Sequence, residues 1–145
     1  MRIRDYQARD FSSLCQLDQT CFPPAIAYDP EEIAAALVQP RTFCVVAEQD
    51  EQIVGFILLH YRRTVGNIIT IDLHPEYRRR GLGSRFMEIA EQHLVQLGVR
   101  RMILEVATNN EAAITFYRAR GFATQRLLPR YYQEGTDAYL MEKTL

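Results

Sequence analysis

The most constraining feature of this 145-residue chain is a predicted strand–loop–helix–strand unit in its second half. Residues 68–73 are mostly apolar and rich in β-branched side chains, as expected for a strand buried on both faces. Residues 84–97 place apolar side chains along one helical stripe and end at Gly98, which suits the left-handed position after a helix. Residues 102–106 predict a second strand. Because two strands joined through a helix form a parallel crossover, the chain is expected to be an α/β protein.

The flanking segments predict further strands and helices on the same sheet. Asp29-Pro30 with Glu32 has the pattern of a capped helix start. Gly66-Asn67 is expected to close the turn before the crossover, and Gly121 to end a short helix. The other strands are predicted at residues 2–6, 42–47 and 53–61 and on either side of residues 129–136, and the other helices after residue 6 and at residues 110–119. We therefore expect one domain, residues 1–145, with a mixed, mostly antiparallel sheet of about seven strands.

Composition and charge exclude several classes of protein. The formal net charge is −1 and the pI is near 6.3, which argues against a nucleic-acid-binding protein. No apolar run approaches the roughly 20 residues of a membrane helix, so a cytoplasmic protein without membrane association is expected. The three cysteines lack CxxC spacing and the three histidines are isolated from one another, so we expect reduced, structural thiols and no metal site.

A glycine-rich basic loop lies between the predicted central strand and its helix. Its sequence is Arg78-Arg79-Arg80-Gly81-Leu82-Gly83-Ser84. Two glycines allow the backbone to bend so that several N–H groups point at one anion, and the helix dipole favours negative charge at the same place. The loop lacks the Gly-Lys-Ser/Thr of a P-loop and the third glycine of a dinucleotide-binding motif. A solvated basic turn is the alternative, but the position and the arginines favour a phosphate-bearing ligand.

The loop resembles the pyrophosphate-binding Arg/Gln-x-x-Gly-x-Gly/Ala segment of the GNAT acetyltransferase superfamily. The resemblance extends over residues 74–77, residues 110–117 and Gly121-Phe122, and is closest to ribosomal-protein alanine and other N-terminal acetyltransferases. It implies that acetyl-CoA is the cosubstrate and that the loop residues bind its pyrophosphate. It also implies a contact of Asn110 with the pantetheine arm and contacts of the backbone of Ile71 and Leu73 with the cofactor, although Asn110 is equally suited to cap a helix.

Acetyl transfer to an amine needs a base for the protonated amine and an acid for the departing thiolate. Glu105 lies inside an otherwise apolar strand, where burial would raise its pKa, and is the candidate base. The alternative is an exposed Glu on an edge strand. The resemblance implies that Tyr117, twelve residues later, is the acid with its hydroxyl near the CoA sulfur. A core tyrosine is the alternative.

Aromatic segments at both ends of the chain resemble the acceptor site of the same enzymes. Phe22, Tyr28 and the pair Tyr131-Tyr132 are the expected substrate contacts, because a tyrosine ring can wall a groove while its hydroxyl binds a main-chain group. An aromatic hairpin packed on the core is the alternative. The chain departs from these relatives at Thr136, where they often carry Glu, and between Pro23 and Asp29.

The sequence therefore predicts an acetyl-CoA-dependent N-acetyltransferase that prefers the α-amine of a protein or peptide N-terminus. Acetylation of a small amine and a non-catalytic acyl-CoA sensor are the two alternatives. The expected partners are acetyl-CoA and the amine acceptor, without nucleic acid or membrane, and the expected state is a monomer or a weak homodimer.

Overall fold

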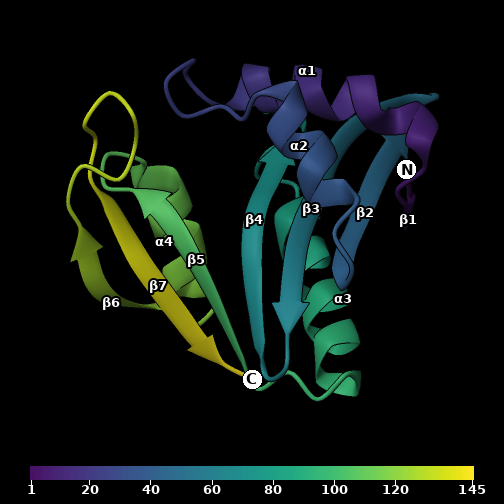
Figure 1. The fold of residues 1–145 in the computed structure, drawn as a ribbon. Coiled ribbons are helices and arrows are strands. Elements are labelled where there is room, and N and C mark those ends of the chain that lie inside the picture. The colour runs from purple at the N-terminus through teal and green to yellow at the C-terminus, as the bar shows by residue number, and fades with distance from the viewer.

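The computed structural model describes residues 1–145 as one seven-stranded sheet with four α-helices packed against it (Figure 1). The strands are β1 (Arg2–Asp5), β2 (Thr42–Gln49), β3 (Gln52–Arg62), β4 (Val65–Leu73), β5 (Arg101–Ala107), β6 (Ala123–Leu128) and β7 (Ala138–Thr144). The helices are α1 (Phe11–Cys21), α2 (Pro30–Leu37), α3 (Leu82–Gln96) and α4 (Glu111–Ala119), with 3₁₀ turns at Ala8–Asp10 and Pro75–Tyr77. The α/β class predicted from the sequence is confirmed.

The strands lie in the order β1-β2-β3-β4-β5-β7-β6. Only β4 and β5 pair in parallel, and α3 connects them, which is the crossover that the sequence predicts. Every other neighbouring pair is antiparallel, so the sheet is mixed and mostly antiparallel as expected. None of the helices combines the length and apolar character needed to cross a bilayer.

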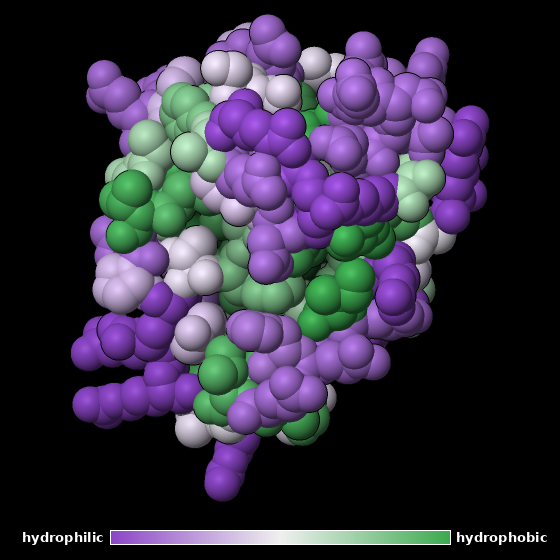
Figure 2. All heavy atoms as spheres, turned by 90° about the vertical axis from the view of Figure 1, so that its right-hand side faces the viewer, coloured by the Kyte–Doolittle hydropathy of each residue, from purple (hydrophilic) through white to green (hydrophobic).

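Two apolar layers cover opposite faces of the sheet. The larger core includes Phe86 and Leu94 of α3 and Ile114 of α4. On the other face, Leu14 and Leu17 of α1 pack against β2 and β3, with α2 beside them (Figure 1). Figure 2 shows the molecule from the side of β1 and α3, where hydrophilic side chains surround separate apolar patches. The sheet is thus the middle layer of three.

Local sequence signals decide where the helices begin and end. Asp29 and Glu32 form the predicted capping box of α2, in which the Asp29 N–H donates to the Glu32 carboxylate at 3.0 Å. α3 is followed by Gly98 in the left-handed conformation, at φ 84°. Both helices therefore lie close to their predicted positions.

The turn between β3 and β4 corrects one prediction. The chain reverses at Arg63 and Thr64, where Arg63 has φ 55°, and Gly66 and Asn67 belong to β4. A Cβ atom on Gly66 would stand 3.0 Å from Leu94 Cδ1. Gly66 is therefore required for the close packing of α3 on the sheet rather than for a turn.

A β-bulge at Ile69 changes the direction of the side chains along β4. Ile68 pairs with Leu59 and Thr70 with Leu58, which leaves Ile69 without a partner on β3. Ile68 packs in the α3 core, whereas Thr70 lies opposite Leu58 in the α1 layer. Buried side chains of residues 68–73 consequently lie on both faces of the sheet, Ile68 on the α3 face and Thr70 and Asp72 on the α1 face, while the positions between them are half-buried.

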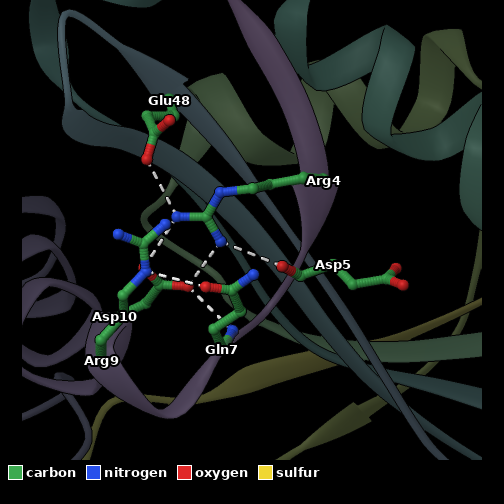
Figure 3. A network of polar contacts seen from close by, with 6 residues as sticks. All are labelled: Arg4, Asp5, Gln7, Arg9, Asp10 and Glu48. Carbon is green, nitrogen blue, oxygen red and sulfur yellow. Dashed lines mark hydrogen bonds and ion pairs between the residues drawn. The ribbon is translucent and has the colours of Figure 1, made fainter.

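The N-terminal strand is held by a buried ion network. The Arg4 guanidinium donates to both oxygens of Asp10, at 2.8 and 2.9 Å, and to Glu48 of β2 at 3.0 Å (Figure 3). Asp10 also accepts the Gln7 N–H at 2.8 Å. The network ties β1, the start of α1 and β2 together.

Candidate active site

The sheet opens between its two parallel strands. β4 and β5 pair from Val65 and Arg101 up to Ile68 and Leu104, and the pairing ends there. Beyond this point the two strands diverge (Figure 1). We call the opening between residues 69–73 of β4 and residues 105–107 of β5 the fork. On the sides that face the fork, the backbone groups of these residues have no strand partner.

The phosphate loop leads from β4 to the start of α3. Gly81 has φ 83°, and a Cβ atom there would have no neighbour within 4 Å. The N–H groups of Leu82, Gly83 and Ser84 precede the first helical hydrogen bond, from Arg85 N–H to the Gly81 carbonyl at 3.0 Å, and no side chain caps them. Three free donors at a helix N-terminus are suited to bind an anion.

The three arginines of the loop point in different directions. Arg78 Nε–H donates to the Leu73 carbonyl at 3.2 Å. The Arg80 guanidinium lies over the Tyr77 ring, 5.2 Å from its centroid, beside a cavity of about 240 Å³ that Met1 and Ile3 also line. Arg79 adopts φ 62° and is exposed. The three arginine side chains therefore do not converge on one point at which a phosphate group could bind.

The polar groups of the fork and the loop fit acetyl-CoA. Unpaired backbone groups of β4 can bind the amides of an extended pantetheine arm, and the uncapped start of α3 can bind a pyrophosphate. Leu82 is buried and Gly83 packs close to Phe116, so both can contribute only backbone groups. Asn110 Oδ1 accepts the Ala113 N–H at 3.2 Å, which makes Asn110 the cap of α4 and leaves its amide NH₂ free.

Glu105 is the first residue of β5 beyond its last pair with β4. Leu104 and Val106 pack in the α3 core, so the Glu105 side chain lies on the α1 face of the sheet. It is half-buried, and burial raises the pKa of its carboxyl group. Because β5 lies between β4 and β7, Glu105 is not on an edge strand, which excludes the structural alternative drawn from the sequence.

Tyr117 of α4 lies on the opposite face of the sheet from the Glu105 side chain. Its ring is buried in the α3 core, in edge contact with Phe116 and Phe122 at centroid distances of 5.4 and 5.6 Å. Burial, followed by the nearby Asp72 and Tyr132, raises the pKa of its phenol, so the hydroxyl stays protonated at neutral pH. The hydroxyl is therefore available as a proton donor.

Three tyrosines and Glu105 form a group on the α1 face. Tyr131 and Tyr132 contact each other edge to face, with centroids 5.0 Å apart. Burial and the neighbouring Tyr131 and Glu105 raise the pKa of Tyr132 to about 12. Burial raises the pKa of Tyr28 as well, and Tyr131, Tyr132 and Glu105 add to this rise. Phe22 is half-buried at the end of α1. Three of the predicted acceptor residues, Tyr28, Tyr131 and Tyr132, thus come together with Glu105.

The loop that carries the tyrosine pair is ordered by Asp137. Its carboxylate accepts the Arg130 N–H at 2.8 Å, and its carbonyl accepts the Thr108 N–H at 3.0 Å. Thr136 donates both its N–H and its hydroxyl to Glu134 within the same loop. Asp137 therefore fixes the loop against the end of β5.

A profile of the acetyltransferase (GNAT) family matches residues 11–122. The chain belongs to this family. It is an acetyl-CoA-dependent N-acetyltransferase, and acetyl-CoA is its cosubstrate.

Individual relatives of this GNAT enzyme are similar to it along nearly the whole chain. An uncharacterized N-acetyltransferase of Methanocaldococcus jannaschii is 30% identical over 99% of this chain and 91% of its own length. An N-alpha-acetyltransferase of Sulfurisphaera tokodaii is 27% identical over 99% of this chain and 93% of its own. The ribosomal-protein-S18-alanine N-acetyltransferase of Escherichia coli superposes with a TM-score of 0.87 at 24% identity, covering 99% of this chain and 92% of that one. The resemblance seen in the sequence is confirmed.

The GNAT fold also brings together two acidic residues that sequence reasoning missed. Asp18 of α1 and Asp72 of β4 are both fully buried on the α1 face. The signal that identified Glu105, a carboxylate in an apolar strand, applies equally to Asp72. Its neighbour on α1 could not be foreseen, because the bulge at Ile69 decides which face Asp72 occupies. No group of three or more His, Cys, Asp or Glu side chains is arranged to hold a metal ion.

Proposed function

We propose that this GNAT enzyme acetylates the α-amine of a protein or peptide N-terminus. The observation that carries the proposal is the group formed by Glu105 with Tyr28, Tyr131 and Tyr132 on one side of the fork, opposite Tyr117 on the other side. An amine held by the tyrosines lies next to a base, and a thioester in the fork lies next to an acid. This division of roles suits direct transfer within a ternary complex.

The acceptor side suits an extended chain. Tyr131 keeps 49% of its surface exposed, so the tyrosine wall opens to solvent. An open wall of rings and hydroxyl groups can hold the main chain of a peptide without enclosing it. A closed pocket, which a small amine would require, would bury this ring. The N-alpha-acetyltransferase of S. tokodaii, whose sequence matches nearly the whole chain, supports the same acceptor.

The proposed chemistry assigns one proton transfer to each side of the fork. Glu105 accepts a proton from the acceptor ammonium group, directly or through a water molecule. Its raised pKa makes it a better match for an α-amine, whose ordinary pKa is about 7.7–8.0, than for a lysine at about 10.4. Tyr117 donates its hydroxyl proton to the departing thiolate. Residues 78–84, the backbone of Ile71 and Leu73, and Asn110 are proposed to bind acetyl-CoA.

The first experiment identifies the acceptor. Purified enzyme is incubated with acetyl-CoA, a set of free-N-terminus peptides and a set of small amines, and products are located by mass spectrometry. The same peptides with blocked N-termini and an internal lysine are the control. We expect acetyl groups on free α-amines only. Acetylation confined to small amines would replace the acceptor, and tight CoA binding without any product would indicate a sensor.

The second experiment tests the assigned roles. Glu105→Gln and Tyr117→Phe should each lower kcat by about 10²–10⁴-fold, the usual contribution of an acid or a base, while acetyl-CoA binding is retained. Glu142→Gln on the neighbouring strand β7 is the matched control and should keep wild-type turnover. Unchanged kcat in Glu105→Gln would exclude Glu105 as the base.

A further inference from the structure

The two buried aspartates near the fork each have one satisfied and one unsatisfied carboxyl oxygen. Asp18 Oδ2 accepts the Tyr28 N–H at 2.7 Å, and Asp72 Oδ1 accepts the Thr70 hydroxyl at 2.5 Å. Asp18 Oδ1 and Asp72 Oδ2 are sealed from solvent and receive no hydrogen bond from any donor of the chain. The two carboxyl groups lie within hydrogen-bonding reach of each other. The two carboxyl groups therefore form one buried pair that holds two oxygens without a donor.

A single proton would satisfy both oxygens. Two ionised carboxylates in contact away from water repel each other, whereas a carboxyl–carboxylate pair with one proton makes a hydrogen bond. Burial raises the pKa of both aspartates, and of Asp72 strongly, in agreement with a retained proton.

The surroundings of the pair supply little positive charge. Arg78 is the one cation that acts on the pair, through Asp72, and it is exposed. Glu32 of α2 adds negative charge near Asp18. The other ionisable groups whose charge acts on Asp18 or Asp72 are neutral when protonated: Cys15 and Cys21 of α1, Tyr28, Cys44 of β2 and, from the other face of the sheet, Tyr117 of α4. These surroundings cannot balance two buried negative charges.

We propose that Asp18 and Asp72 share one proton in the folded enzyme, and that the bridged pair positions Tyr28 against the fork. The second part rests on the proposed function, in which Tyr28 contacts the acceptor. Asp18 and Asp72 are thus positioning residues that act through Tyr28, not catalytic residues.

Tyr28 is held at two points, and both lead to β4. Its N–H donates to Asp18, which the shared proton joins to Asp72, and its hydroxyl donates to the carbonyl of Ile69 at 3.3 Å. Ile69 is the bulged residue at which β4 separates from β5. The pair therefore links the segment between α1 and α2, which has no regular structure, to the strand that forms one side of the fork.

The shared proton is tested by counting protons on unfolding. Above the ordinary aspartate pKa, near 3.8, the unfolded chain releases both protons while the folded chain keeps one. The pair therefore contributes a tenfold increase in the unfolding equilibrium constant per pH unit, until pH reaches the raised folded pKa. Stability curves in urea between pH 5.5 and 7.5 measure this slope.

Isosteric amides remove the proton and keep the hydrogen bond. We expect Asp18→Asn, Asp72→Asn and the double variant to lose the same part of the pH dependence of unfolding. Each variant should release one proton fewer on unfolding than wild type, because one proton serves both residues. Single variants with the wild-type slope would overturn the shared proton. A double variant that loses two protons would show that each residue is protonated independently, which also contradicts the proposal.

The positioning of Tyr28 is tested by measuring KM for the amine and KM for acetyl-CoA separately. Asp18→Ala removes the acceptor of the Tyr28 N–H and should raise KM for the amine about tenfold or more without changing KM for acetyl-CoA. Asp18→Asn retains an oxygen at this place and should keep KM for the amine within about twofold of wild type. If Asp18→Ala fails to fold, Tyr28→Phe removes the second tie and should raise the same constant.

An unchanged KM for the amine in Asp18→Ala or Tyr28→Phe would overturn the positioning role. The proton count requires no substrate, so it decides the first part of the proposal even if no peptide is acetylated. KM would then be measured with the amine that the enzyme does turn over. Failure of the proposed acceptor and failure of the shared proton are thereby distinguished.

Discussion

Replacing Gly81 by alanine separates ligand binding by the phosphate loop from the backbone geometry of the chain. Gly81 caps α3 at φ 83°, and Gly98 follows the same helix at φ 84°. A Cβ atom at either position would have no neighbour within 4 Å. Gly98→Ala is therefore a matched control with the same backbone strain and the same absence of a clash, at the end of α3 that faces away from the loop.

The expected losses of stability and of acetyl-CoA affinity follow from the left-handed backbone at both glycines and from the free N–H groups beside Gly81. An alanine in the left-handed region costs about 1–2 kcal/mol. For a chain of this size each kcal/mol lowers Tm by roughly 2–4 °C, so both variants should lose roughly 2–8 °C. Only Gly81→Ala also disturbs the free N–H groups of α3. Losing one hydrogen bond to a charged phosphate costs about 1.5–3 kcal/mol, which corresponds to roughly a 10- to 150-fold weaker binding of acetyl-CoA.

Calorimetry of CoA binding and thermal unfolding of the free proteins measure the two effects separately. We expect similar losses of Tm in both variants and a weakened CoA affinity in Gly81→Ala alone. Equal CoA affinities in Gly81→Ala and wild type, with Tm lowered as in Gly98→Ala, would refute the assignment of the loop as the pyrophosphate site.

Four further outcomes are expected. Arg4→Met should cost about 3–5 kcal/mol of unfolding free energy in urea, because it leaves Asp10 buried without its ion pair, whereas Arg101→Met, which breaks a more exposed pair with Glu142, should cost at most about 1 kcal/mol. Asn110→Ser should keep the α4 cap and its stability, so a raised KM for acetyl-CoA in this variant would identify a cofactor contact, and an unchanged KM a purely structural cap. On the acidic side of the pH profile of kcat/KM, wild type should lose activity as Glu105 is protonated, at a pH above its ordinary pKa of 4.5, and Glu105→Gln should lack this step; the same step in both would exclude Glu105. Cys44 should resist alkylation at neutral pH, as measured by mass spectrometry, because partial burial raises its pKa to about 12, and rapid labelling would contradict this raised pKa.

Local signals in the sequence were sufficient for several parts of the protein. The capping box at Asp29 and Glu32 and the glycine after α3 are interactions between neighbouring residues, so they could be predicted without the fold. The phosphate loop was recognised for the same reason, because its glycines and the start of its helix are consecutive in the chain. The succession of strands and helices along the chain and the parallel crossover were predicted from the alternation of hydrophobic patterns, whereas the order of the strands in the sheet was not.

Other features depend on residues far apart in sequence, and only the tertiary structure decided them. The bulge at Ile69 reflects the pairing of β4 with β3, and it turns Asp72 toward Asp18, 54 positions earlier in the chain. The same strand separates from β5 after Ile68, which places Glu105 at the fork. Gly66 suggested a turn, but its role is set by the close packing of Leu94 from α3. The sequence by itself determined which residue types and local elements were available for the chemistry, whereas strand register and packing determined which of them meet, because side chains so far apart are brought into contact only by the folded sheet.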